Sequence, residues 1–80
     1  MKTHIYITLK HGVLDPQGEA AAKSLKHLGH DGIEGLRIGK FIELDVDANS
    51  ADEATKKAEA MCEALLANTV IESYRVEVAA

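Results

Sequence analysis

The chain has 80 residues, of which 46% are hydrophobic and 28% charged, and its formal net charge is −4. A domain of this length buries only about 60–65% of its unfolded surface, so its stability is marginal unless a disulfide, a metal or a partner chain reinforces it. Cys62 is the only cysteine, which excludes an internal disulfide, and no Cys/His cluster supports a structural metal. We therefore expect residues 1–80 to form one domain that a partner chain stabilises.

Charge and hydropathy also argue against two classes of partner. The acidic balance and the aromatic content of 4% disfavour nucleic-acid binding, which requires a basic face and stacking platforms. The longest apolar runs are far shorter than the roughly 20 residues of a membrane span, and the first of them is too short for a signal peptide. A lone cysteine suits a reducing compartment. We expect a cytoplasmic protein that binds neither nucleic acid nor membrane.

Residues 3–10 alternate between apolar and polar side chains, which predicts a first strand. One face of this strand carries Ile5, Ile7 and Leu9. Gly12 follows as a break.

A helix is predicted to begin at Asp15 and Pro16. Aspartate suits the N-cap, and proline suits the first helical position because its φ is preset and its missing N–H is not needed there. Gly18 costs about 1 kcal/mol relative to alanine within a helix, so we expect another segment to approach its backbone closely. The helix continues over residues 20–28 and ends before Gly29. Its apolar stripe consists of Ala21, Leu25 and Leu28.

The stretch 36–46 is predicted to be one long strand. A hairpin with its turn at Gly39 and Lys40 would pair Arg37 with Ile42 and so place charged and apolar side chains on the same face. A continuous strand instead puts apolar residues at every even position except Lys40. Such a strand, straight or bulged at the glycine, is about 35 Å long. This is longer than a small domain needs, so we expect half of it to reach outside its own subunit.

A second helix and a last strand complete the chain. Ser50 and Glu53 have the spacing of a capping box, and the helix is expected to run to about Ala67 with Asn68 as its C-cap. Residues 71–78 alternate and form the last strand. The expected core stripe of the helix comprises Ala54, Ala58, Met61, Cys62, Leu65 and Leu66.

The order of elements, strand–helix–long strand–helix–strand, predicts an α+β fold. It is related to the ferredoxin-like βαββαβ fold with its central hairpin opened into a single strand. An opened hairpin is a common way for protomers to exchange segments. We expect two helices on one face of an antiparallel or mixed sheet that dimerisation completes.

Few residues suggest chemistry. Cys62 lies in the apolar stripe with no neighbouring cation, which predicts a buried, unreactive thiol rather than a nucleophile. His27 and His30 have the spacing of half a metal site but lack further ligands. Two interpretations of Arg37 and Lys40 remain open: a bulge with the lysine lying along an apolar neighbour, or a contact with an anion or a partner's acid. No catalytic, cofactor-binding or metal-binding residue is predicted.

Three segments resemble the PurS family, the small subunit of phosphoribosylformylglycinamidine synthase. They are VLDPQG at 13–18, RIGKFIEL at 37–44 and CEALLANTVIESY at 62–74, and they occur in the family's order and spacing. The candidate contacts with partner subunits or with a second copy lie within them: Asp15, Pro16, Gln17, Gly18, Arg37, Gly39, Lys40, Asn68, Thr69 and Tyr74.

This resemblance implies a step of purine biosynthesis catalysed by a glutamine-dependent carbon–nitrogen ligase. Formylglycinamide ribonucleotide, ATP and glutamine yield formylglycinamidine ribonucleotide. A PurQ-type glutaminase frees the ammonia, and a PurL-type synthetase holds ATP and magnesium. The PurS-type subunit is a non-catalytic homodimer, or a tetramer, that bridges the two and holds no cofactor of its own. An alternative function is a regulatory module on a ferredoxin-like sheet that binds a small anion at Arg37 and Lys40.

Overall fold

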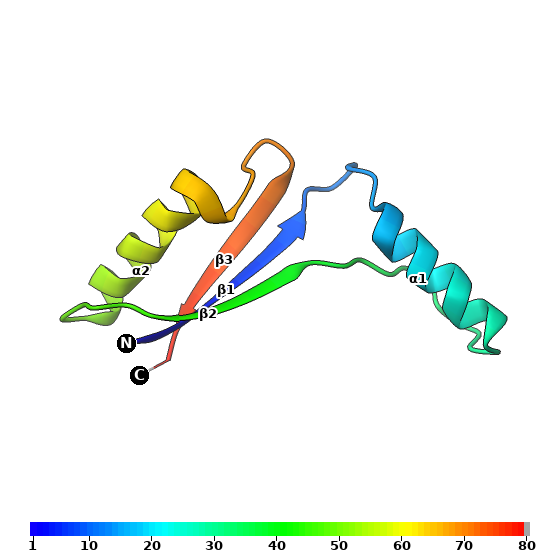
Figure 1. Cartoon of the computed structure of the whole chain (residues 1–80), viewed down its shortest axis with the longest axis horizontal. Coiled ribbons are helices and arrows are strands. Elements are labelled where there is room, and N and C mark those ends of the chain that lie inside the picture. The colour runs from blue at the N-terminus through cyan, green and yellow to red at the C-terminus, as the bar shows by residue number, and fades with distance from the viewer. Residues whose placement is uncertain (80) are drawn as a thin grey trace.

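The computed structural model describes residues 1–79. Its elements in chain order are β1 (Lys2–Leu9), α1 (Pro16–His27), β2 (Lys40–Asp45), α2 (Ala51–Met61), the π-helical turn η1 (Cys62–Leu66) and β3 (Glu72–Val78). The strands form an antiparallel sheet with the order β2-β1-β3 (Figure 1). The predicted order of elements is confirmed.

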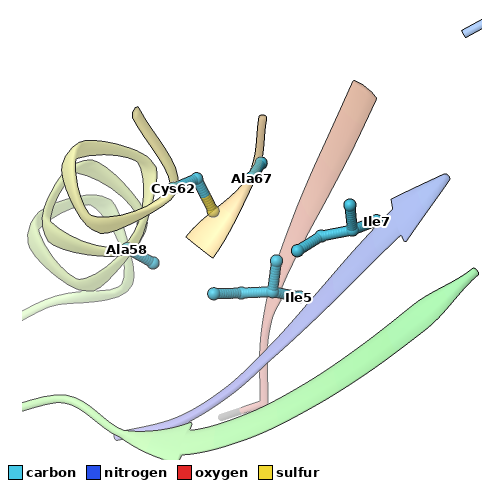
Figure 2. Packing of buried hydrophobic residues seen from close by; sticks show 5 residues of the cluster. All are labelled: Ile5, Ile7, Ala58, Cys62 and Ala67. Atoms are coloured by element: carbon cyan, nitrogen blue, oxygen red, sulfur yellow. The ribbon is translucent and has the colours of Figure 1, made fainter. Parts of the chain in front are cut away.

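The core lies between the sheet and α2. The central strand β1 contributes Ile5 and Ile7, which are at most 1% exposed. Figure 2 shows Ala58 and Cys62 facing these isoleucines, with Ala67 beside them at the end of the helical segment. Small side chains every fourth residue let α2 approach the sheet closely, so a few residues fill the core of this small domain.

Hydrogen bonds at the start of α2 confirm the predicted capping box. The Glu53 N–H donates to Ser50 Oγ over 3.1 Å, and the Asn49 N–H donates to Glu53 Oε2 over 2.9 Å. The glutamate therefore reaches one residue further back than in the usual motif.

The predicted core stripe of α2 is wrong on one side. Met61 is 40% exposed and Leu65 is 83% exposed. The stripe is wider than the sheet beneath it, because β2 is the edge strand on that side. An open apolar depression of about 480 Å³ results, which we call the edge groove. It is lined by Ile42, Leu44, Met61, Ala64, Leu65 and Leu66.

Helix α1 forms as predicted but lies beyond the end of the sheet (Figure 1). It ends at His27 with Leu28 as its C-cap, and Gly29 follows with a φ of +92°, the left-handed conformation typical of a glycine just after a helix. Its apolar stripe is not a core stripe, since Leu25 is half-buried and Leu28 is 75% exposed. Within one chain, α2 therefore covers the sheet as expected, whereas α1 does not.

The predicted long strand is regular only over Lys40–Asp45, where it pairs with β1. Residues 36–39 leave the sheet and run toward α1 (Figure 1). A Cβ at Gly39 would lie 2.4 Å from the Ile7 carbonyl oxygen, so glycine is required where the chain departs. The alternation of residues 36–39 continues that of β2, but the pairing with β1 stops at Ile7 and Lys40, and β1 ends at Leu9, so the same register leaves Arg37 and Leu36 without a neighbouring strand.

The chain is elongated. Its radius of gyration is 15.8 Å, whereas a compact chain of 80 residues has a value of about 12 Å. It exposes 5804 Å², compared with about 4,700 Å² for a compact monomer of this mass. We call residues 10–39 the arm and the remaining described residues the body. The arm is what makes the molecule long (Figure 1).

Candidate functional site

Most of the predicted contact residues meet where the arm joins the body. Residues 15–18 begin α1, residues 37–40 lead into β2, and residues 68–69 lead into β3. Because β1 is antiparallel to both neighbours, its C-terminal end lies beside the N-terminal ends of β2 and β3. Segments far apart in sequence thus form one junction.

Asp15 ties the start of α1 to the segment that precedes β2 at this junction. Its carboxylate accepts hydrogen bonds from the Gly18 N–H over 3.0 Å and from the Ile38 N–H over 2.9 Å. Arg37 Nε lies 4.0 Å from the same carboxylate. The N–H groups of Ile38 and Gly18, aided by the arginine, hold the pKa of Asp15 below its usual value. The predicted N-cap is confirmed, and it has the further role of anchoring the segment before β2.

Gly18 is buried against this segment. A Cβ there would lie 2.4 Å from Asp15 Oδ2 and 2.7 Å from the Leu36 carbonyl oxygen. The expectation that another segment approaches the helix backbone at this glycine is confirmed. Pro16 and Gln17 of the same turn are exposed.

Arg37 and Lys40 are both engaged within the chain. Arg37 Nη2 donates to the carbonyl oxygens of Leu9 and Lys10 over 3.1 and 3.3 Å, and so covers the end of β1. Lys40 Nζ lies 3.6 Å from Glu72 Oε2. The two cations neutralise groups of their own subunit, so they do not form an open anion site, and the alternative of an anion-binding regulatory module is not favoured.

Asn68 and Thr69 form the turn that leads into β3. Asn68 Oδ1 accepts a hydrogen bond from the Val70 N–H over 3.2 Å, and its carbonyl accepts one from the Glu72 N–H over 2.7 Å. The Thr69 carbonyl accepts one from Lys10 Nζ over 2.6 Å. The predicted C-cap at Asn68 is wrong, because the π-helical turn ends at Leu66 and its C-cap is Ala67.

Sequence reasoning missed Glu72, which links these parts. Its Oε2 lies near Lys40, and its Oε1 accepts a hydrogen bond from the Asn68 N–H over 2.7 Å. In the sequence Glu72 is an acidic residue of a segment in which apolar and polar side chains alternate. Its neighbours in sequence do not indicate that it contacts Lys40 and Asn68.

Tyr74 lies apart from the junction. It packs against the core cluster on the α2 side of the sheet. Burial, followed by the neighbouring Glu63, raises the pKa of its hydroxyl. Its position is that of a body residue.

The face of the sheet opposite α2 carries a row that the sequence analysis did not single out. Phe41, Tyr6 and Arg75 lie side by side on adjacent strands. The two rings are 5.1 Å apart, and the arginine lies 4.3 Å above the tyrosine ring. The alternation within each strand predicts which face each of these side chains is on. It does not predict which strands are neighbours, so the sequence does not show that the three side chains meet.

A metal ion requires several His, Cys, Asp or Glu side chains in a suitable arrangement. Within residues 1–79 no group of three or more His, Cys, Asp or Glu side chains is placed to hold a metal ion. His27 and His30 are exposed at the tip of the arm. Cys62 is fully buried, as predicted, and burial, followed by Glu63, raises the pKa of its thiol. No helix in the same range has the length and hydropathy of a membrane span.

Comparisons with known proteins agree on one family. The profile described as PurS, Phosphoribosylformylglycinamidine (FGAM) synthase, matches residues 2–80. The phosphoribosylformylglycinamidine synthase subunit PurS of Synechocystis is 49% identical over 95% of this chain and 76% of that protein. The Bacillus subtilis subunit is 46% identical over 96% of this chain and 90% of its own length.

Solved structures give the same answer. A crystal structure of Bacillus subtilis PurS has a TM-score of 0.86 and 43% identity, with 99% of this chain and 98% of that chain covered. A chain of the PurLQS structure from Thermotoga maritima has a TM-score of 0.87 and 34% identity, with 95% of this chain and 93% of that chain covered. Because the profile covers nearly the whole chain and both the sequences and the solved structures match, the chain belongs to the PurS family of phosphoribosylformylglycinamidine synthase subunits.

Proposed function

We propose that this chain is the non-catalytic subunit that holds a PurQ-type glutaminase and a PurL-type synthetase together during purine biosynthesis in the cytoplasm. The observation that carries this proposal is that the polar side chains of the junction are engaged with one another while the chain exposes an unusually large surface. Across residues 1–79, the polar groups at the junction bind one another and form no catalytic set, whereas about 1,100 Å² more surface is exposed than in a compact monomer.

The reaction gives such a subunit a physical purpose. Ammonia released from glutamine would be protonated and lost if it escaped into water before it reached the synthetase. The two active sites must therefore be docked and sealed, and docking requires complementary surfaces rather than nucleophiles. In this proposal ATP and magnesium bind the synthetase subunit, and this chain holds no cofactor.

The chain acts as a homodimer in this proposal. The junction fixes the arm in place. The exposed turns of the junction are the candidate contacts with the partner subunits. The junction residues are Asp15–Gly18, Arg37, Gly39, Lys40 and Asn68–Thr69. The PurLQS structure from Thermotoga maritima, which contains a similar chain, supports association with PurL-type and PurQ-type partners.

Reconstitution tests the proposed function. Purified glutaminase and synthetase are assayed for formylglycinamidine ribonucleotide with and without this chain, first with glutamine and then with ammonium chloride as the nitrogen source. We expect glutamine-dependent turnover to require this chain and ammonium-dependent turnover to be unchanged. Full glutamine-dependent turnover without this chain would contradict the proposal.

A further inference from the structure

We infer that the face of the sheet opposite α2, which we call the outer face, receives one of the partner subunits proposed above. The partner docks through an arginine or lysine that stands beside an apolar side chain. This inference rests on the proposed function and names the surface that performs it. The outer face carries three rows of side chains, in order away from the junction: Phe41, Tyr6 and Arg75, then Glu43, His4 and Glu77, then Asp45 and Lys2.

Within residues 1–79, no helix covers the outer face. Ile5 and Ile7 of β1 point toward α2 (Figure 2), so Tyr6 between them points the other way. Helix α1 lies beyond the end of the sheet (Figure 1). Phe41 is 53% exposed, and Tyr6 is half-buried. The two aromatic side chains are therefore open to a partner.

The rings at the centre of this face are held in place before a partner arrives. The rings of Phe41 and Tyr6 are 5.1 Å apart, and the His4 ring meets Phe41 edge-on at 5.2 Å. The Arg75 guanidinium lies 4.3 Å from the centre of the Tyr6 ring and donates to Glu77 Oε1 over 2.7 Å. Because these contacts order the side chains, little conformational entropy is lost when a partner covers them. Aromatic residues and arginine are also enriched at the core of protein interfaces.

The charges beside the rings define what the partner must carry. Arg75 is paired with Glu77, so the base nearest the rings is already neutralised. Among residues 1–79, neither Glu43 nor Asp45 has a lysine or arginine at ion-pair distance. Glu43 Oε1 lies 3.4 Å from Nε2 of His4, which is charged only when protonated. An incoming base therefore meets unanswered carboxylates, whereas an acidic or nucleic-acid partner is repelled.

The spacing of the two anchors restricts the partner further. Glu43 and Phe41 lie two residues apart on β2, which places them on the same face and about 7 Å apart along the strand. A base and an apolar side chain reach both if they stand two residues apart on a strand, or three to four residues apart on a helix. One short element of the partner therefore satisfies the whole contact.

The outer face is continuous with the junction. Thr8 and Ser73 are exposed and lie opposite each other, between the aromatic row and the turn at which Lys10 binds Thr69. Three strands of seven residues outline about 14 Å by 23 Å, which is less than the about 800 Å² per partner that a stable interface buries. The exposed turns of the junction supply further area. The outer face is then the centre of the interface, and the junction is its rim.

Titration of the reconstituted complex with variants of this chain tests the charged half of the contact. Glu43→Lys reverses a charge on the outer face. Glu59→Lys is the matched control, because Glu59 is an exposed acid of α2 on the other side of the sheet. We expect the chain concentration at half-maximal glutamine-dependent turnover to rise roughly tenfold for Glu43→Lys and to stay unchanged for Glu59→Lys.

Salt separates a charge effect from a general loss of structure. The difference between Glu43→Lys and the wild type should narrow as sodium chloride is raised, because salt screens exposed charges. Equal half-maximal concentrations for the wild type and Glu43→Lys would overturn the inference. If the wild-type chain itself does not stimulate glutamine-dependent turnover, the proposed function fails. If the wild type stimulates turnover and the variant matches it, the inference alone fails.

Phe41→Thr tests the apolar half of the contact. Threonine favours a strand, so we expect the circular dichroism spectrum and the sedimentation of the isolated chain to stay unchanged. The half-maximal concentration in the reconstituted complex should rise roughly tenfold. Weaker self-association of the isolated variant would overturn the inference, because a second copy of this chain would then occupy the outer face.

Hydroxyl-radical labelling locates the contact without a substitution. Phe41 on the outer face and Met61 on the α2 side of the sheet are both exposed in the chain. We expect the partner subunits to protect Phe41 from labelling and to leave Met61 unchanged, and each subunit added alone identifies which one docks. Equal labelling of Phe41 with and without both partners would overturn the inference.

Discussion

The two helices of this chain are alike in length and amphipathic pattern, yet their surroundings differ. Helix α2 lies on the sheet, and Ala54 and Ala58 are fully buried beneath it. Of the residues of α1, Gly18 alone is buried, and it lies against the Asp15 carboxylate and the Leu36 carbonyl rather than an apolar core. The period of a pattern thus identifies a helix and its apolar side, but it does not identify what covers that side. The body has a core within one chain, whereas most of the apolar side of α1 is exposed in that chain.

Truncation of the core should have the largest effect. Ile5→Ala removes most of a side chain that is 0% exposed, so we expect the free energy of unfolding to fall by about 2–5 kcal/mol. Leu28→Ala in the arm, measured at a concentration at which the chain is monomeric, should cost less than about 0.5 kcal/mol. Urea titration measures both. Similar losses for the two variants would erase the distinction between body and arm.

Gly39→Ala tests the point at which the arm leaves the body. The new Cβ would meet the Ile7 carbonyl oxygen at 2.4 Å, so β2 must move away from β1, at a cost of about 1–3 kcal/mol. Gly35→Ala is the control, because no atom lies within 4 Å of the added carbon and its φ is not positive. We expect the control to be neutral or slightly stabilising. If both variants unfold at the same urea concentration, the close approach at Gly39 does not constrain the chain.

The Asp15 anchor should respond to acid. Its folded pKa is lowered, so the stabilisation it provides is present above the ordinary carboxyl pKa of 3.8 and is lost as the pH falls through the lower folded value. We expect the amide resonance of Ile38 to shift in this acid range while that of Ile5 stays fixed. Asp15→Asn should speed exchange of the Ile38 amide several-fold at neutral pH. An Ile38 resonance that ignores pH below 3.8 would show that the carboxylate does not hold it.

The thiol of Cys62 should give the smallest effect. Its pKa is raised by burial, and it is 0% exposed, so a thiol reagent should label it only as fast as the body opens. The labelling rate of the folded protein at neutral pH should therefore rise with urea in step with unfolding. Rapid labelling without denaturant would place the cysteine at an accessible surface instead of in the core.

Local chemistry made part of this structure predictable. The caps at Asp15 and Ser50 follow from residue type and spacing, and the close approach at Gly18 follows from the cost of glycine in a helix. The extent of the long strand did not follow, because alternation fixes a face but does not supply a neighbouring strand. Likewise, nothing near Leu65 in the sequence shows that the sheet ends beneath it.

The junction was predictable only in part for the same reason. Asp15, Arg37 and Lys40 drew attention by type, but their bonds run to Ile38, to the end of β1 and to Glu72. These partners are 23 to 32 positions away, counted from Asp15 to Ile38 and from Lys40 to Glu72. Only the pairing of the strands brings them together.

Hydrogen exchange at high and low protein concentration tests most directly whether the body is stable within one chain while the arm depends on a partner for its protection. The account predicts that the amides of α1 lose protection on dilution, as the proposed dimer dissociates, while the amides of β1 stay protected. Protection of α1 that is strong and equal at every concentration, in a chain that sediments as a monomer, would contradict it.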